Sequence, residues 1–221
     1  TMTNETVKCN FDRGRRFDVD VMDDLETAGL AFGRLSAQFI RDKVVPELDA
    51  FRFASYCGIS GVTKKEETLA DGAATVAALS AAVTAMDDEE VTATGRYLFI
   101  TPTLLQGIND MDTTKSKKVL EGFEQVIKVP QRRFYTAIKQ LSGKTGEEAG
   151  GYTKAAGAAN INFAIVQKDA LIQYTKHAAP KIIAPENNPD ADAYVFGYRM
   201  VGIAKAYKNM LSGMYFSHDK A

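Results

Sequence analysis

The sequence predicts an α+β fold in which one long helix accompanies several strands. Two patterns indicate this: an apolar stripe with helical spacing runs over 24–56, and short alternating or apolar runs of strand length occur on both sides of it. The composition supports a folded chain, since 45% of the 221 residues are hydrophobic and 25% are charged. We therefore expect one domain or two interleaved lobes.

The charge balance and the apolar runs exclude two classes of protein. A formal net charge of −1 argues against a dedicated DNA-binding module, which would be strongly basic. The longest unbroken apolar runs have four residues, as in Tyr97–Ile100, so no membrane-spanning helix is expected.

The first segment, 1–21, alternates apolar and polar residues with the period of a strand. Gly14 predicts a turn or bulge within it. Arg13, Arg15 and Arg16 form a short basic cluster beside this glycine. Two interpretations remain open for the cluster: a solvated hairpin tip, or a contact with an acidic surface of a partner.

A long helix is expected over 24–56, where the apolar stripe begins with Leu25, Ala28, Phe32, Leu35 and Phe39. At 1.5 Å per residue this helix would be roughly 45–50 Å long. Pro46 lacks a backbone N–H and should kink or restart it.

The remaining elements follow from composition and from turn residues. An Ala-rich helix is expected over 68–86, and the four carboxylates of 87–90 that follow predict a solvated charge run. A contiguous run points carboxylates apart, whereas a metal site needs ligands that converge. The other predictions are a strand over 96–101 with Pro102 starting a short helix, a polar loop over 109–118, a strand over 123–129, an exposed mobile loop over 140–160, a buried strand over 161–166, a short helix over 168–176, and two long closing strands over 193–206 and 210–216 that form a hairpin.

No concentration of catalytic groups is found. Gly143-Lys144-Thr145 resembles part of a phosphate-binding loop, but the position that requires the loop's first glycine is Ile138. The two cysteines, Cys9 and Cys57, are far apart, and the two histidines, His177 and His218, are too few for a metal site. This absence argues against an enzyme, we expect no cofactor, and the long helix and strands suggest surfaces for self-association without naming a function.

Six segments in order resemble the major capsid protein of tailed bacteriophages, which has the Hong Kong 97-like fold. They are DRGRRFDVDVMDDLE (12–26), FIRDKVVPELDAFRFASY (39–56), RYLFITPTLLQGI (96–108), FEQVIKVPQRRF (123–134), NFAIVQKDALIQYTKHAAPKII (162–183) and DADAYVFGYRMVGIAKAYKNMLSGMYFS (190–217). The resemblance covers nearly the whole chain.

The resemblance implies a fold with a long spine helix, a peripheral domain and an axial domain. It assigns 1–57 to the peripheral domain, 58–192 mainly to the axial domain, and 193–221 to closing strands. It also implies that an N-terminal arm and most of an extended loop precede Thr1, so that the chain is an N-terminally truncated fragment that begins inside a strand.

The function that the resemblance implies is structural. The chain would assemble with itself, as pentamers and hexamers, into the icosahedral shell of a tailed phage or prophage around the DNA genome. Scaffolding and portal proteins are further partners, and DNA would be contacted non-specifically. Localisation would be the virion, assembled in the cytoplasm of the host bacterium, with Arg13, Arg15 and Arg16 as the candidate subunit contact. An encapsulin-like nanocompartment shell and an α+β enzyme or binding protein are the alternatives.

Overall fold

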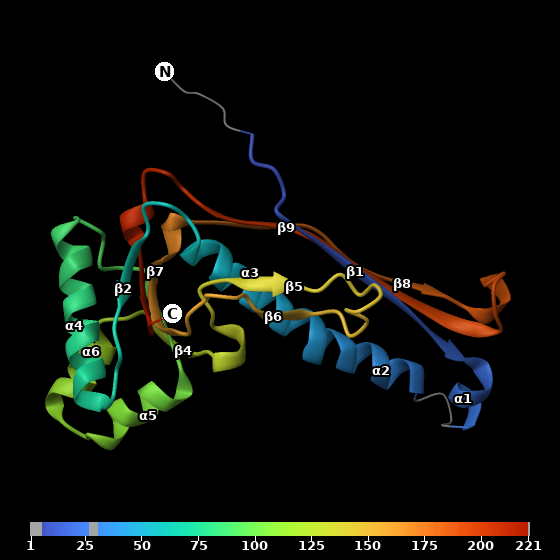
Figure 1. The fold of residues 1–221 in the computed structure, drawn as a ribbon, viewed down its shortest axis with the longest axis horizontal. Coiled ribbons are helices and arrows are strands. Elements are labelled where there is room, and N and C mark those ends of the chain that lie inside the picture. Colours follow the sequence, from blue (N-terminus) through green and yellow to red (C-terminus); the bar gives the residue numbers. More distant parts are fainter. Residues whose placement is uncertain (1–5, 27–30, 221) are drawn as a thin grey trace. The chain divides into compact units, whose positions relative to one another are not determined.

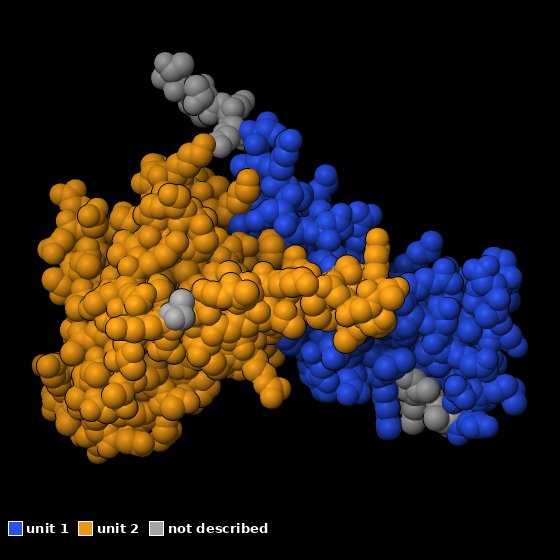
Figure 2. Space-filling model, viewed as in Figure 1, with its two compact units in different colours: residues 1–46, 173–204 blue, residues 47–172, 205–221 orange. Residues whose placement is uncertain are grey.

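A computed structural model describes residues 6–26 and 31–220. The chain is mixed α+β, as predicted (Figure 1). It divides into two compact units, coloured in Figure 2. Unit 1 comprises 1–46 and 173–204, and unit 2 comprises 47–172 and 205–221.

Unit 1 is built on a three-stranded sheet of order β1-β9-β8. Its strands are β1 (Phe11–Asp20), β8 (Leu171–Ile183) and β9 (Ala193–Ala206). β1 pairs antiparallel with β9 without any shift in register. The turn or bulge predicted at Gly14 is therefore wrong. A Cβ atom on Gly14 would lie 3.1 Å from the carbonyl oxygen of Tyr198, so the glycine permits close strand approach.

The predicted strand is also too long at its start. Residues 7–10 are not part of a strand, and the predicted start at Thr1 lies outside the described residues. Asn10 ends the pairing with its side chain: Nδ2 donates to the carbonyl of Ala204 at 2.9 Å, and Oδ1 accepts from the amide of Ala204 at 2.9 Å.

The long helix predicted over 24–56 is confirmed from Ala31 to Cys57, and 27–30 lie outside the described residues. It consists of α2 (Ala31–Phe39), η1 (Ile40–Val44) and α3 (Val45–Cys57), and the short α1 (Val21–Glu26) precedes it. η1 is a π-helical turn in which the amide of Val45 donates to the carbonyl of Ile40. This wider turn comes directly before Pro46, where the ring would meet the carbonyl of the residue four positions back. The helix therefore changes its winding at the proline and continues.

The aromatic side chains of α2 pack on the sheet of unit 1. Phe39 lies 5.5 Å from Phe17, and Phe32 lies 5.4 Å from Tyr194, measured between ring centroids. Leu35, predicted on the same stripe, is instead 45% exposed. The two phenylalanines are seven residues apart and nearly aligned, whereas Leu35 is rotated about 60° from Phe32, beyond the narrow sheet.

Unit 2 is built on a five-stranded sheet of order β2-β10-β7-β3-β4. Its strands are β2 (Thr63–Glu66), β3 (Arg96–Ile100), β4 (Gln125–Lys128), β7 (Ile161–Gln167) and β10 (Met214–His218). Its helices α4 (Gly72–Asp88), α5 (Pro102–Asp110) and α6 (Thr114–Glu121) pack against one another. Every residue of β7 is buried, as predicted for 161–166. The core centres on Leu79, Leu98 and Ile165.

Four predictions for the second half of the chain need correction. The polar loop ends at Thr113, because the side chains of Thr113 and Ser116 cap α6 reciprocally. The helix predicted over 168–176 is only the short turn η3 (Lys168–Ala170), followed by β8. β9 is confirmed, but β9 and β10 belong to different sheets and form no hairpin. The stretch 140–160 is not one loop, because β5 (Ile138–Gln140) pairs with β6 (Tyr152–Lys154).

Three further short turns connect these elements: η2 (Gln131–Arg133), η4 (Pro185–Asn187) and η5 (Leu211–Gly213).

Candidate subunit-contact surface

The three arginines predicted as a subunit contact all lie in β1, within unit 1. Alternate residues of a strand face opposite sides of its sheet. Arg13 and Arg15 pair with Met200 and Tyr198, on the side of the aromatic cluster. Arg16 pairs with Gly197 and faces the other side. The three arginines therefore do not form one cluster. They also do not lie at a hairpin tip, because all three belong to the paired part of β1.

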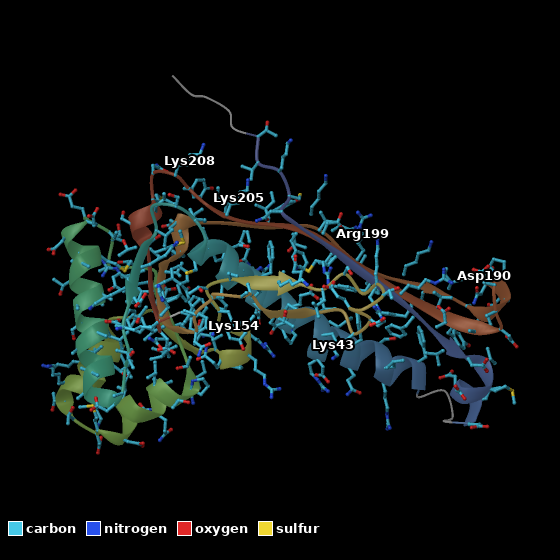
Figure 3. The ribbon with its side chains drawn as sticks, in the orientation of Figure 1. Lys43, Lys154, Asp190, Arg199, Lys205 and Lys208 are labelled. Carbon is cyan, nitrogen blue, oxygen red and sulfur yellow. The ribbon has the colours of Figure 1, made fainter. Side chains whose placement is uncertain are left out.

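Charges on the second side of the sheet are already paired within the chain. Arg199 binds the carboxylate of Asp12 through two hydrogen bonds of 2.9 and 2.6 Å, which lower the pKa of Asp12. Arg16 lies 3.4 Å from Asp18 and 3.8 Å from Asp190. Figure 3 shows Asp190 near the turn between β8 and β9, and Arg199 further along β9. Exposed pairs of this kind contribute little stability but fix the positions of the charges.

Both edges of the three-stranded sheet belong to described edge strands, β1 and β8. β8 is the more open of the two, since every residue from Gln173 to Ile182 is exposed. A long exposed edge strand presents backbone donors and acceptors and is a ready surface for another chain. This surface was not expected from the sequence, because a helix was predicted over 168–176.

Exposed apolar side chains concentrate in unit 1. Among the described residues, all of the large exposed hydrophobic side chains except Tyr207 lie in this unit: Met22, Leu25, Leu35, Val45, Tyr174 and Ile182. Contiguous patches of such side chains mark places that a partner covers, whereas single ones are common on folded proteins. Leu25 was expected on the buried stripe of the long helix but is 67% exposed, and Met22 falls outside that stripe, next to carboxylates.

The cysteines and histidines do not come together as a catalytic site in the part of the chain that the structure describes. Cys57 is buried, and burial raises the pKa of its thiol, which makes it a poor nucleophile. His177 lies in exposed β8. Within the described ranges, no three His, Cys, Asp or Glu side chains are arranged to hold a metal ion.

The resemblance to a phosphate-binding loop has a structural explanation. Residues 142–145 lie in the turn between β5 and β6, where the amide of Ser142 donates to a carboxylate oxygen of Glu147 at 2.7 Å. The carboxylate of Glu147 thus accepts the hydrogen bond from an amide that a phosphate would otherwise need as a donor. Among the described helices, none is both long and apolar enough to cross a bilayer.

Comparison with known proteins gives a consistent fold. No family model and no curated protein sequence matches the chain. A structure from Mycobacterium phage Che8 matches with a TM-score of 0.60 and 11% identity, covering 98% of this chain and 76% of that one. The capsid structure of cyanophage P-SCSP1u matches with a TM-score of 0.57 and 14% identity, covering 99% and 77%.

A third match is the virus-like particle from Pyrococcus furiosus. Its TM-score is 0.59 at 9% identity, with 93% of this chain and 75% of that chain covered. At identities this low the matches establish the fold. The chain therefore has the Hong Kong 97-like fold of these capsid and particle proteins.

Proposed function

We propose that this chain is the subunit of a closed protein shell, the capsid of a tailed bacteriophage or prophage. The observation that carries the proposal is the fold match to the capsid of cyanophage P-SCSP1u, which extends over 99% of this chain. A match over the whole chain leaves no additional described domain that would suggest a different activity. In this role the protein is structural, and it resides in the virion.

The surface of unit 1 supports this proposal. A subunit of a shell needs exposed apolar side chains and open strand edges that neighbouring copies cover. Unit 1 supplies both, through β8 and through the exposed side chains of Met22 and Leu25. We assign unit 1 to the peripheral domain and unit 2 to the axial domain. The sequence-based boundaries at 57/58 and 192/193 stay a prediction.

The partners of this subunit follow from the same proposal. Copies of the chain would form pentamers and hexamers, and scaffolding and portal proteins would join them during assembly. Any contact with packaged DNA would be non-specific, since the near-neutral charge of the chain argues against a dedicated DNA-binding module. Assembly would take place in the cytoplasm of the host bacterium.

The experiment is electron microscopy of the full-length natural protein, produced in bacteria with the products of its neighbouring genes. We expect closed icosahedral particles that contain this chain as their main component. A protein that stays monomeric under all of these conditions, or that binds a small molecule stoichiometrically and turns it over, would contradict the proposal.

A second candidate is an encapsulin-like nanocompartment shell. It is favoured by the match to the virus-like particle from Pyrococcus furiosus, whose TM-score is similar. The contents of purified particles separate the two functions: nuclease-resistant DNA supports the phage capsid, whereas an enclosed protein in fixed proportion supports the nanocompartment.

A further inference from the structure

Two surfaces of unit 1 carry exposed apolar side chains beside charges of opposite sign. The α1 surface consists of Asp20, Met22, Asp23, Leu25 and Glu26. The β8 surface is the exposed edge strand itself, with Tyr174, Lys176 and Ile182 on one face and His177 and Lys181 on the other.

The α1 surface is apolar at its centre and acidic around it. Met22 and Leu25 are 64% and 67% exposed, and their spacing of three residues places them on one side of the helix. The stretch 17–26 contains five carboxylates and no lysine or arginine. An apolar patch surrounded by carboxylates fits a partner surface that is both apolar and basic.

The short helix is anchored to its unit. The amide of Val21 donates to the carbonyl of Asp192 at 3.2 Å, and the carboxylate of Asp20 accepts from the amide of Met22 at 2.8 Å. At the other end, Asp24 accepts from the amide of Phe32 at 3.1 Å. The α1 surface is therefore presented in a fixed position within unit 1.

The β8 surface has the complementary composition. The strand contains two lysines and one histidine but no aspartate or glutamate. Tyr174 and Ile182 are 61% and 58% exposed. Within the part of the chain that the structure describes, neither Lys176 nor Lys181 forms an ion pair. These lysines are therefore available to carboxylates of another molecule.

The two surfaces belong to opposite edges of the sheet. β8 forms one edge and β1 the other, with β9 between them. α1 follows β1 directly and contacts β1 and α2. No ion pair joins the two surfaces within the described chain. A second copy placed beside the first can bring one surface of each copy into contact.

We infer that the α1 surface of one copy docks on the β8 surface of a neighbouring copy. The contact is heterologous, because two different patches meet, and repeated contacts of this kind close into rings when the rotation permits. Met22 and Leu25 would be buried against Tyr174, which lies beside Lys176 on the same face of β8, while the surrounding charges select the register and speed association. This inference rests on the proposed function, since it names the partner surface of the same subunit.

Charge reversal tests the contact on the 221-residue chain itself. One variant carries Lys176→Glu and Lys181→Glu, a second carries Asp23→Lys and Glu26→Lys, and a third combines all four substitutions. We expect the unaltered chain to self-associate reversibly in sedimentation velocity. Each reversal should raise the dissociation constant at least about tenfold through like-charge repulsion, and the combined variant should recover most of the loss.

Salt and a matched variant provide the controls. Raising the ionic strength from about 0.1 M to about 1 M shortens the Debye length from about 10 Å to about 3 Å and should weaken the association. A variant with Lys115→Glu and Lys128→Glu changes two exposed lysines of unit 2 by the same charge. It should associate like the unaltered chain, and circular dichroism should show that all variants are folded.

Carbodiimide cross-linking identifies the contact directly. The reagent joins a lysine Nζ to a carboxyl carbon as an amide and takes up the water that is lost. In a mixture of isotope-labelled and unlabelled chains, we expect intermolecular links from Lys176 or Lys181 to Asp20, Asp23 or Glu26.

Three results would overturn the inference: a chain that sediments as a monomer at every concentration, reversals that leave association unchanged, or intermolecular links that avoid these residues. Shells assembled from the reversed full-length protein would refute this contact and leave the proposed function intact. Failure of the unaltered full-length protein to form shells would refute the proposed function instead.

Discussion

Phe39 attaches the long helix to the sheet of unit 1 through rings on both neighbouring strands. Its ring centroid lies 5.5 Å from that of Phe17 and 6.3 Å from that of Phe196. Because Phe39 is half-buried, Phe39→Ala should lower the free energy of unfolding by about 2–3 kcal/mol, below the range for a fully buried ring.

Leu35 provides the matched control, since it lies on the same helix but is exposed. Leu35→Ala should change the free energy of unfolding by less than about 0.5 kcal/mol. Urea denaturation of both variants checks this. Equal losses would show that α2 does not pack on the sheet through its phenylalanines.

Arg96 is buried at the start of β3, and its guanidinium donates hydrogen bonds to backbone carbonyls of the loop before this strand. Its Nε donates to the carbonyl of Thr92 at 3.1 Å, and its Nη2 contacts both the carbonyl of Val91 and, at 2.7 Å, the carboxylate of Asp87. Arg96→Met keeps the apolar stem but removes these donors, so we expect a loss of about 2–3 kcal/mol.

Arg132 is exposed and serves as the control for the loss of a guanidinium. Arg132→Met should cost less than about 0.5 kcal/mol in the same denaturation experiment. If Arg96→Met unfolds at the same denaturant concentration as the unaltered chain, the buried donors do not hold this loop.

At the scale of elements, the turn between β5 and β6 is organised by one carboxylate. Lys139 and the amide of Ser142 both donate to Glu147 and lower its pKa to about 2, from an ordinary value of 4.5. Because the pKa of Glu147 is lower in the folded chain, its ionised carboxylate stabilises the fold. This stabilisation is fully present above about pH 4.5 and is lost as the pH falls through about 2.

Lys139→Met should therefore raise the pKa of Glu147 toward its ordinary value. Lys144→Met, which changes the other lysine of this region, should leave the pKa low. Carboxyl NMR titration measures both. A Glu147 that already titrates at its ordinary value in the unaltered chain would contradict this description of the turn.

The same turn should be the first site of limited proteolysis. Residues 141–151 join β5 to β6, and several of their glycines have positive φ angles, so the segment buries little apolar surface. Ala158 and Ala159, which sequence analysis included in the loop, are buried and should be protected. We expect trypsin to cut first after Lys144, and Lys144→Gln to delay the cut. A first cut within 31–57 would mean that the long helix is not a stable element.

The elements that sequence predicted correctly are those with strong local signals. β7 is a run of buried apolar residues, and Pro102 starts α5 as expected. β8 could not be predicted in this way, because its exposed Lys176 and Ala178 suit a helix locally, and only pairing with β9 makes it a strand. The grouping of the three arginines was wrong, since a strand without a bend separates Arg16 from Arg13 and Arg15, whereas their role as a subunit contact stays a prediction.

At the scale of the whole molecule, the two compact units differ in how much of their apolar surface is buried within the unit itself. Unit 2 has a five-stranded sheet and a continuous buried core, centred on residues such as Leu98 and Ile165. Unit 1 has a three-stranded sheet and most of the large exposed apolar side chains of the described chain. We therefore expect unit 1 to acquire much of its remaining burial from neighbouring copies.

We propose that the chain forms the wall of a closed shell, and the decisive experiment is electron cryo-microscopy of particles from the full-length natural protein. We expect an icosahedral reconstruction in which this Hong Kong 97-like fold repeats around five-fold and six-fold positions, with the exposed side chains of unit 1 covered by neighbouring copies. A natural protein that stays monomeric alongside its neighbouring gene products, or particles whose wall is built from a different chain, would contradict it.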